Sequence, residues 1–181
     1  MLMGTLIVTV IYNVFAWPFT SMIPVIGTDY LHLDPQGVGL LASCEGIGGL
    51  LGALLVAVFA HSAWYGRVYV GSVAVYLAMV IGFATAPAAP IAALFLLLLG
   101  VAAVGFAVLQ ATLVYQGSPV EMRARLLGVL SVCIGTGPIG FVYLGFLADV
   151  LTPRVGTVAL AAQGMLALLI TRRYWVAVLR L

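Results

Sequence analysis

The side chain best suited to chemistry in this sequence is Glu45, the one acidic residue inside a long apolar segment. A charged group in the middle of a bilayer costs at least about 2.5 to 3.5 kcal/mol, so its presence needs a reason. Gly48, Gly49 and Gly52 follow at i+3, i+4 and i+7 on the same helix face, where small residues let a second helix approach. Two interpretations stay open: a residue that couples substrate movement to protons, or a neutral carboxyl group hydrogen-bonded to a neighbouring helix.

A second set of candidate residues lies in the first apolar segment at helical spacing. Positions i, i+4, i+7 and i+11 of one helix face are Asn13, Trp17, Thr20 and Pro24. Polar and aromatic side chains among aliphatic neighbours predict one wall of a substrate cavity, and an interhelical seam with one amphipathic Trp is the alternative. Gln110 and Tyr143 are further cavity candidates, each also explained by a single interhelical hydrogen bond.

Proline and glycine interrupt two of the apolar segments. Pro18 and Pro24 remove backbone hydrogen-bond donors, and broken membrane helices occur chiefly where they face protein or water. The run 135–140 fits the G-x-G-x-x-G pattern of dinucleotide sites, but it lies inside an apolar segment with no strand before it. It therefore predicts a kinked, closely packed helix. We assign helix packing and bending to Pro24, Gly48, Gly52, Gly137, Pro138 and Gly140.

Other kinds of chemistry lack the residues that they need. His32 and His61 fall in loops predicted on opposite sides of the membrane, so they share neither a metal ion nor a nucleophile. Cys44 and Cys133 lie in apolar stretches and are expected to be packed thiols. We therefore expect no metal, no cofactor and no enzyme active site. The basic residues are scattered arginines, which argues against a nucleic-acid partner.

Composition defines the environment in which these residues work. Hydrophobic residues make up 65% of the 181 residues and charged residues 7%, whereas a soluble domain carries about 25% charged residues. Such a chain predicts lipid as its solvent and an all-α membrane protein, with one transmembrane domain over residues 1–181. Because about 20 helical residues cross a bilayer, we predict six spans, at 4–27, 37–60, 67–86, 90–115, 126–148 and 154–173.

The arginines predict the orientation of these spans, because basic residues near helix ends are retained in the cytoplasm. With a cytoplasmic N-terminus, the outside carries only Arg154. The cytoplasmic side then carries Arg67, Arg123, Arg125, Arg172, Arg173 and Arg180. We therefore expect a multi-pass protein of the plasma membrane, the inner membrane of a bacterium, with both termini in the cytoplasm and the lipid bilayer as a partner.

One cytoplasmic connection carries a local helix signal. Ser118, Pro119 and Glu121 stand in the order of a capping box, with a Ser cap, Pro at the first helical position and Glu at the third. The sequence therefore predicts that a helix begins there. Glu121 lies four residues before Arg125, and both Arg123 and Arg125 can reach lipid phosphates. A solvated start to the fifth span is the alternative.

Several longer motifs resemble one known family. They are Ser21-Met22-Ile23-Pro24-Val25, Gly46-Ile47-Gly48-Gly49-Leu50-Leu51-Gly52, Leu109-Gln110-Ala111-Thr112, Pro119-Val120-Glu121-Met122-Arg123-Ala124-Arg125 and Gly137-Pro138-Ile139-Gly140. On these residues the chain resembles the C-terminal six helices of the major facilitator superfamily, and within it the bacterial enterobactin-exporter-like and macrolide-efflux-like members. The likeness covers nearly the whole chain. The loop 61–67 departs from it, since only Gly66-Arg67 remains of the usual Asp-Arg-x-Gly-Arg signature.

The resemblance implies both a fold and a function. Each six-helix half of that fold is a 3+3 inverted repeat, and the Gly-rich second and fifth predicted spans hold corresponding positions in it. The implied activity is the export of small amphipathic molecules by alternating access, with proton antiport through Glu45. The expected partners are a small-molecule substrate and either a separate N-terminal half or a second copy of the chain. An inactive fragment and a membrane scaffold or accessory protein are the alternatives.

Overall fold

Helices dominate the structure, because an apolar chain must satisfy its backbone N–H and C=O groups within its own segments. The structure, a computed structural model, describes residues 2–59, 61 and 64–180, and this part of the chain holds helices and no strand. The all-helical class predicted from the sequence is confirmed. With η for 3-10 or π segments, the elements are α1 (Leu2–Ile11), η1 (Tyr12–Ala16), η2 (Trp17–Ser21), α2 (Met22–Asp29), α3 (Pro35–Phe59), α4 (Tyr65–Thr85), α5 (Ala89–Gly117), η4 (Val120–Met122), α6 (Arg123–Ile134), α7 (Gly137–Val150), α8 (Pro153–Ile170), α9 (Arg172–Trp175) and η5 (Val176–Arg180).

Six helical stretches of the described chain are long and apolar enough to cross a membrane. They are Leu2–Asp29, Pro35–Phe59, Tyr65–Thr85, Ala89–Gly117, Val120–Val150 and Pro153–Ile170. The first and the fifth of these spans are composite, each built from several helical segments. Residue 60, the end of the second predicted span, and residues 1 and 181, the ends of the predicted domain, lie outside the described residues.

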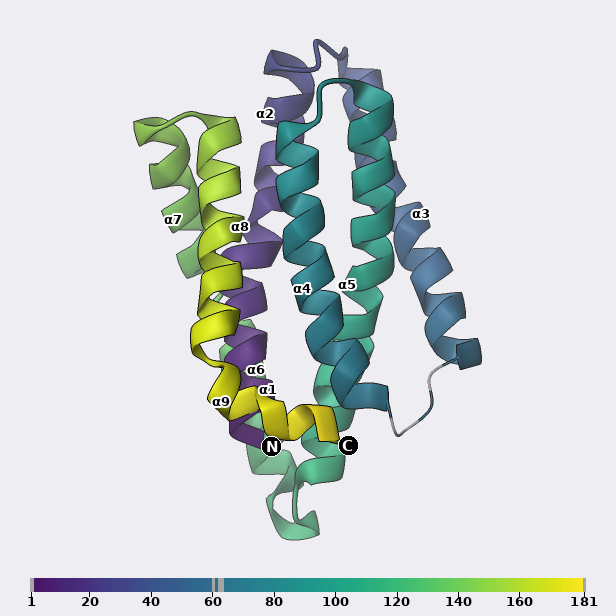
Figure 1. Cartoon of the computed structure of the whole chain (residues 1–181), viewed down its shortest axis with the longest axis vertical. Helices are drawn as coiled ribbons and strands as arrows, with labels where there is room; N and C mark the ends of the chain where they lie inside the picture. The colour runs from purple at the N-terminus through teal and green to yellow at the C-terminus, as the bar shows by residue number, and fades with distance from the viewer. Residues whose placement is uncertain (1, 60, 62–63, 181) are drawn as a thin grey trace.

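The helices pack around the first span (Figure 1). α5 lies between α3 and α4, and α8 packs against both α4 and α7. α7 packs against η1 and η2, α1 contacts α5 and α6, and α2 contacts α3 and α8. η1 also contacts α4 and α8, so the first span contacts all five of the others. Residues of the first span are therefore the ones best placed to link a central site to the rest of the bundle.

α3 and α5 meet at glycines on both helices. A Cβ atom on Gly48 would overlap the backbone oxygen of Leu97, and one on Gly100 would overlap the backbone oxygen of Glu45. Gly52 makes the same kind of backbone approach one turn further along α3. Membrane helices associate chiefly by such close packing, because lipid tails leave no hydrophobic drive between them.

We predict that Gly48→Ala destabilises the protein by about 1 to 3 kcal/mol, the usual range for an overpacked contact. Gly46→Ala is the matched control in the same helix, because a Cβ atom there meets nothing within 4 Å. The measurement is the free energy of unfolding in mixed detergent micelles, followed by circular dichroism. Equal stability of the two variants would show that the glycine contact between α3 and α5 is not a close one.

One arginine ties together three connections at one end of the bundle. Arg154, at the start of α8, donates a hydrogen bond from Nη2 to the carbonyl oxygen of Ala86, which lies between α4 and α5, at 2.8 Å. Its guanidinium carbon lies 4.6 Å from the centre of the Tyr30 ring, just after α2. Hydrogen bonds to charged groups contribute about 1.5 to 3 kcal/mol, so this residue holds the three loops together.

We predict that Arg154→Ala lowers the free energy of unfolding by about 2 kcal/mol, since it removes a charge-assisted hydrogen bond and a cation–π contact. Arg172→Ala serves as the control, because Arg172 is exposed and its side chain makes no hydrogen bond or ion pair among the described residues. The same micelle titration measures both. A loss in Arg172→Ala as large as that in Arg154→Ala would contradict the assignment.

The connection between α5 and α6 differs from the predicted capping box. α5 continues to Gly117, and the Ser118 hydroxyl group donates back to the carbonyl oxygen of Val114. The 3-10 turn that follows begins at Val120 and has no side-chain hydrogen bond at its cap. The capping interaction predicted for Ser118 is therefore wrong, because the end of the preceding helix takes the hydroxyl group.

Two charged residues of this connection are exposed, and a third, Arg123, is half-buried. Arg123 donates a hydrogen bond from Nη1 to the Tyr115 hydroxyl group at 3.1 Å, and its guanidinium carbon lies 4.1 Å from the centre of the same ring. Glu121 and Arg125 are exposed, and among the described residues no ion pair joins them. Arg123 thus links α6 to the end of α5.

The C-terminal segment lies across one end of the bundle, beside the start of the chain (Figure 1). A Cβ atom on Gly4 or Gly66 would overlap the backbone of this segment, at Tyr174 and Val178 respectively. The last predicted span ran to residue 173, whereas α8 ends at Ile170 and α9 begins a new direction. Both ends of the described chain therefore lie on the same side of the bundle, as an even number of crossings requires.

Candidate functional site

The first span changes its helix type in the middle of its length. η1 (Tyr12–Ala16) is a π-helix, and η2 (Trp17–Ser21) is a 3-10 helix. Pro18 has no N–H group to donate into a regular α-helix, which accounts for the change. The Thr20 hydroxyl group donates to the carbonyl oxygen of Trp17 at 3.0 Å. A side chain of the span thus satisfies a backbone group beside the interruption.

The fifth span is interrupted as well. α6 ends at Ile134 and α7 begins at Gly137, with Thr136 between them. The Thr136 hydroxyl group donates to the carbonyl oxygen of Cys133 at 2.7 Å. Pro138 stands in the first turn of α7, where a missing N–H group is tolerated. The G-x-G-x-x-G run therefore begins in the turn between α6 and α7 and continues into the first turn of α7, and a helix precedes it.

The two interruptions pack against each other. A Cβ atom on Gly137 would lie 2.8 Å from a ring atom of Trp17, and one on Gly140 would overlap the carbonyl oxygen of Val14. The Trp17 and Phe141 rings meet edge to face, with their centroids 5.1 Å apart. We call this contact the broken-helix junction and define it by Val14, Trp17, Gly137, Gly140 and Phe141.

Buried hydrogen bonds run along the first span and reach α4. The Thr9 hydroxyl group donates to the carbonyl oxygen of Thr5 at 3.0 Å and lies 2.8 Å from the Tyr69 hydroxyl group. The Tyr69 hydroxyl group is also 2.9 Å from the Thr5 carbonyl oxygen. Asn13 donates from Nδ2 to the carbonyl oxygen of Thr9 at 2.9 Å. These polar groups are buried with partners, which is the condition for keeping them inside the bundle.

Six buried aromatic rings form a column through the bundle. Successive ring centroids lie 3.7 to 5.8 Å apart, distances at which aromatic rings attract one another. α4 contributes three of the rings at seven-residue intervals, the first span two and α5 one. In spatial order they are Tyr69, Phe106, Tyr12, Tyr76, Phe19 and Phe83. The column fixes the first span against α4 and α5.

Glu45 lies on α3 beside this column and is partly buried. Its carboxyl group is within electrostatic range of the hydroxyl groups of Tyr12 and Tyr76. Among the described residues, the Glu45 side chain makes no hydrogen bond or ion pair. The Tyr76 hydroxyl group is fully buried and has no partner of normal hydrogen-bond geometry, with the Tyr12 hydroxyl group beside it. A carboxyl group without a hydrogen bond among the described residues is therefore within electrostatic range of a pair of buried phenols.

The predicted cavity residues of the first span do not share one face. Asn13 is 4% exposed, whereas Trp17 is 42% exposed and packs on α7. A π-helix has i to i+5 hydrogen bonds, so residues four apart no longer align through it. Thr20 is partly buried and bonded within its own helix, and Pro24 is exposed in α2.

Gln110 and Tyr143 take separate positions. Gln110, in α5, has a buried Oε1 atom with no partner among the described residues. Tyr143, in α7, donates from its hydroxyl group to Gln163 Oε1 of α8 at 2.8 Å. No hydrogen bond joins either residue to Glu45, so the sequence-based cavity candidates are spread over several places.

Five residues of the site were not selected from the sequence, although two signals pointed to them. Thr5 and Thr9 precede Asn13 at four-residue spacing, so the polar stripe of the first span begins two turns earlier than predicted. The other three are aromatic and carry a hydroxyl group: Tyr12, Tyr69 and Tyr76. Two of these lie seven residues apart, a spacing that places them on one helix face.

No protein-family model, curated protein or solved structure matches this chain. Within residues 2–59, 61 and 64–180, no three His, Cys, Asp or Glu side chains are grouped as metal ligands would be. The function must therefore be inferred from Glu45, the aromatic column and the broken-helix junction.

We predict opposite outcomes for two buried tyrosines of α4. Tyr69→Phe removes a hydroxyl group with two hydrogen-bonded neighbours and should cost about 1 to 3 kcal/mol of unfolding free energy. Tyr76→Phe removes a hydroxyl group that has no partner of normal hydrogen-bond geometry among the described residues, so stability should be unchanged or slightly higher. Denaturation of both variants in the same micelles checks this. A larger loss in Tyr76→Phe than in Tyr69→Phe would contradict the hydrogen-bond assignment.

Proposed function

We propose that this chain is a six-helix half of a major facilitator transporter that exports small amphipathic molecules by alternating access. We propose further that Glu45 couples export to protons. The observation that carries the proposal is a partly buried carboxyl group in a membrane-length helix, which makes no hydrogen bond or ion pair among the described residues and is within electrostatic range of two phenols. Ionisable groups inside membrane helices commonly belong to proton or substrate pathways.

The helix contacts support a 3+3 arrangement. If spans 1, 2 and 3 correspond to spans 4, 5 and 6, the contact of span 2 with span 4 (α3 with α5) corresponds to that of span 5 with span 1 (α7 with η1 and η2). In the same way, the contact of span 3 with span 4 (α4 with α5) corresponds to that of span 6 with span 1 (α8 with η1). The contact of span 3 with span 6 (α4 with α8) lies on the symmetry axis and corresponds to itself. Two three-helix repeats related by a two-fold axis have this pattern, which is the organisation of each major facilitator half.

The broken-helix junction supports alternating access. Discontinuous helices in transporters lie at the elements that move and that line the substrate path. Here the interruptions at Pro18 and Thr136 lie in the first and fifth spans, which pack against each other. At both interruptions a threonine hydroxyl group donates a hydrogen bond to a nearby backbone carbonyl oxygen. The two halves of each span can therefore tilt without leaving that carbonyl group unpaired in lipid.

The surroundings of Glu45 support the proposed proton coupling. A protonated carboxyl group is neutral and is tolerated without a partner, whereas a carboxylate inside the membrane needs hydrogen-bond donors or water. The Tyr12 and Tyr76 hydroxyl groups are the donors within electrostatic range. We propose that loss of the proton favours a conformation in which these phenols reach the carboxylate, and that uptake of a proton favours the one described above.

The second and fifth spans support a larger assembly. Of an 18-residue apolar stretch within each of these spans, 17% is buried inside the chain, against 50% for the corresponding stretch of the first span. Their free faces carry large apolar side chains, including Leu50, Leu54, Val142 and Phe146. Such faces suit lipid or a second transporter half, either a separate N-terminal half or a second copy of this chain. The arginine distribution supports a plasma-membrane protein with cytoplasmic termini.

We predict that Glu45→Gln abolishes export driven by a proton gradient while the protein still inserts and folds. The readout is the efflux of lipophilic dyes from vesicles containing the purified protein, with and without an imposed pH gradient. Glu121→Gln is the matched control, since Glu121 is exposed in a connecting loop. Glutamine keeps the size and polarity of the side chain but carries no proton to exchange.

Unchanged transport and unchanged pH dependence in Glu45→Gln would contradict the coupling role and favour a structural carboxyl group. Native mass determination in mild detergent distinguishes the assemblies. A dimer with transport indicates a half-size exporter, and a monomer that transports only with six further helices indicates a split one. Absence of transport in every combination would favour the scaffold or fragment alternatives.

A further inference from the structure

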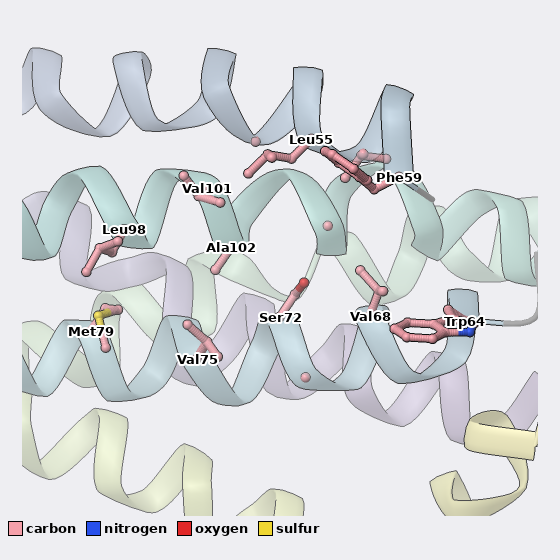
Figure 2. A pocket seen from close by; sticks show the side chains of 14 residues that line it. Leu55, Phe59, Trp64, Val68, Ser72, Val75, Met79, Leu98, Val101 and Ala102 are labelled. Atoms are coloured by element: carbon pink, nitrogen blue, oxygen red, sulfur yellow. The ribbon is translucent and has the colours of Figure 1, made fainter. Parts of the chain in front are cut away.

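A long apolar groove runs along the outside of the bundle between α3 and α4, with α5 as its floor (Figure 2). Its volume is about 550 Å³, within the range of about 300 to 1,000 Å³ that holds small-molecule ligands. Its apolar lining comes from all three helices and includes Leu55, Phe59, Val68, Val75, Leu98 and Val101. It is separate from Glu45 and from the broken-helix junction.

The groove has the length and the lining of a site for a hydrocarbon chain. Trp64 and Met79 mark its two ends on α4 in Figure 2, and 15 residues at about 1.5 Å each give about 22 Å. One leaflet of a bilayer core is about 15 Å deep, so a chain that follows the groove stays in contact with protein over its whole length. Ser72 and Trp64 are the polar side chains of the lining, too few to orient a polar substrate.

One end of the groove carries the chemistry of a membrane surface. Trp64 stands just before α4 and is 61% exposed, as suits an amphipathic ring at the headgroup level. Arg67 lies three residues after Trp64 and four before Gly71, both of which line the groove, so its side chain belongs to the same helix face. Arg67 is exposed and makes no hydrogen bond or ion pair among the described residues.

We propose that this groove binds one acyl chain of an anionic phospholipid, whose phosphate group pairs with Arg67. The lining supplies apolar contact for the chain, Trp64 stands at the headgroup level, and the free guanidinium group supplies charge complementarity. A guanidinium group binds phosphate oxygens through two parallel N–H groups. The proposal does not depend on transport, since it uses only the outer face of α3, α4 and α5.

The test uses quenching of Trp64 fluorescence by brominated acyl chains. The variant Trp17→Phe/Trp175→Phe leaves Trp64 as the single tryptophan, since the chain has three. It is reconstituted into vesicles of phosphatidylcholine with equal mole fractions of brominated phosphatidylglycerol or brominated phosphatidylcholine. We expect brominated phosphatidylglycerol to bind about five-fold better, the preference that one basic residue near an anionic headgroup supplies. Arg67→Gln should bring the two lipids to equal quenching.

A filled groove supplies the second arm of the test. Gly71 lines the groove and a Cβ atom there meets nothing within 4 Å, so Gly71→Leu should occupy the groove without strain and remove the excess quenching. Gly145→Leu is the matched control, because Gly145 is an equally open helical glycine in α7. Retention of phosphatidylglycerol by the wild-type chain in native mass spectrometry, and its loss in Gly71→Leu, would support the same site without any change of tryptophan.

Two results would overturn the proposal. Equal quenching by both lipids in the single-tryptophan variant, with Arg67 and Gly71 unchanged, would mean that ordinary annular lipid fills the groove. Weak quenching by both lipids would mean that something other than lipid, such as a second copy of the chain, covers it. Circular dichroism of each variant shows whether a loss of binding is a loss of fold, and failure of the wild-type chain to retain phosphatidylglycerol in native mass spectrometry would contradict the proposal without any variant.

Discussion

The fold depends on close backbone approach between helices that gain nothing from hiding apolar surface, because their solvent is itself apolar. Gly48 and Gly100 let α3 and α5 touch backbone to backbone, and Gly140 does the same for α7 and the first span, while Gly137 makes room for the Trp17 ring. Larger side chains at these points would separate the helices and forfeit the dispersion contacts that hold them. The position of every polar group inside the bundle follows from these approaches.

Once the helices are this close, buried polar groups must find partners within the protein. Most do. The Thr9 and Tyr69 hydroxyl groups are hydrogen-bonded to each other, and the Tyr69 hydroxyl group also bonds the Thr5 carbonyl oxygen. Thr20 and Thr136 donate to backbone carbonyl oxygens beside the helix interruptions. Among the described residues the exceptions include Glu45, the Tyr76 hydroxyl group and Gln110 Oε1, and the first two are within electrostatic range of each other. The Glu45 carboxyl group, which makes no hydrogen bond or ion pair among the described residues, is free to change its partners, and the proposed proton coupling requires such a change.

The sequence was sufficient for the six long helices and the all-helical class, because span length and the scarcity of charge are properties of composition alone. It was insufficient for the site. The prediction of one polar face from Asn13 to Pro24 assumed a regular α-helix. The π-helix at Tyr12–Ala16 changes the angular spacing of these residues, so they no longer align. The capping box failed at Ser118 because α5 runs further than its apolar pattern indicates. The pairing of Tyr69 with Thr9 depends on which helices become neighbours, and local periodicity carries no such information.

The central claim is that Glu45 changes its protonation state inside the folded bundle. Infrared difference spectra of the reconstituted protein, recorded across a pH series for the wild type and for Glu45→Gln, test it most directly. We predict a carboxylic-acid band that is absent from Glu45→Gln and that disappears and returns reversibly with pH while the amide bands remain helical. A Glu45 band that stays unchanged at every pH at which the helices are intact would contradict the account.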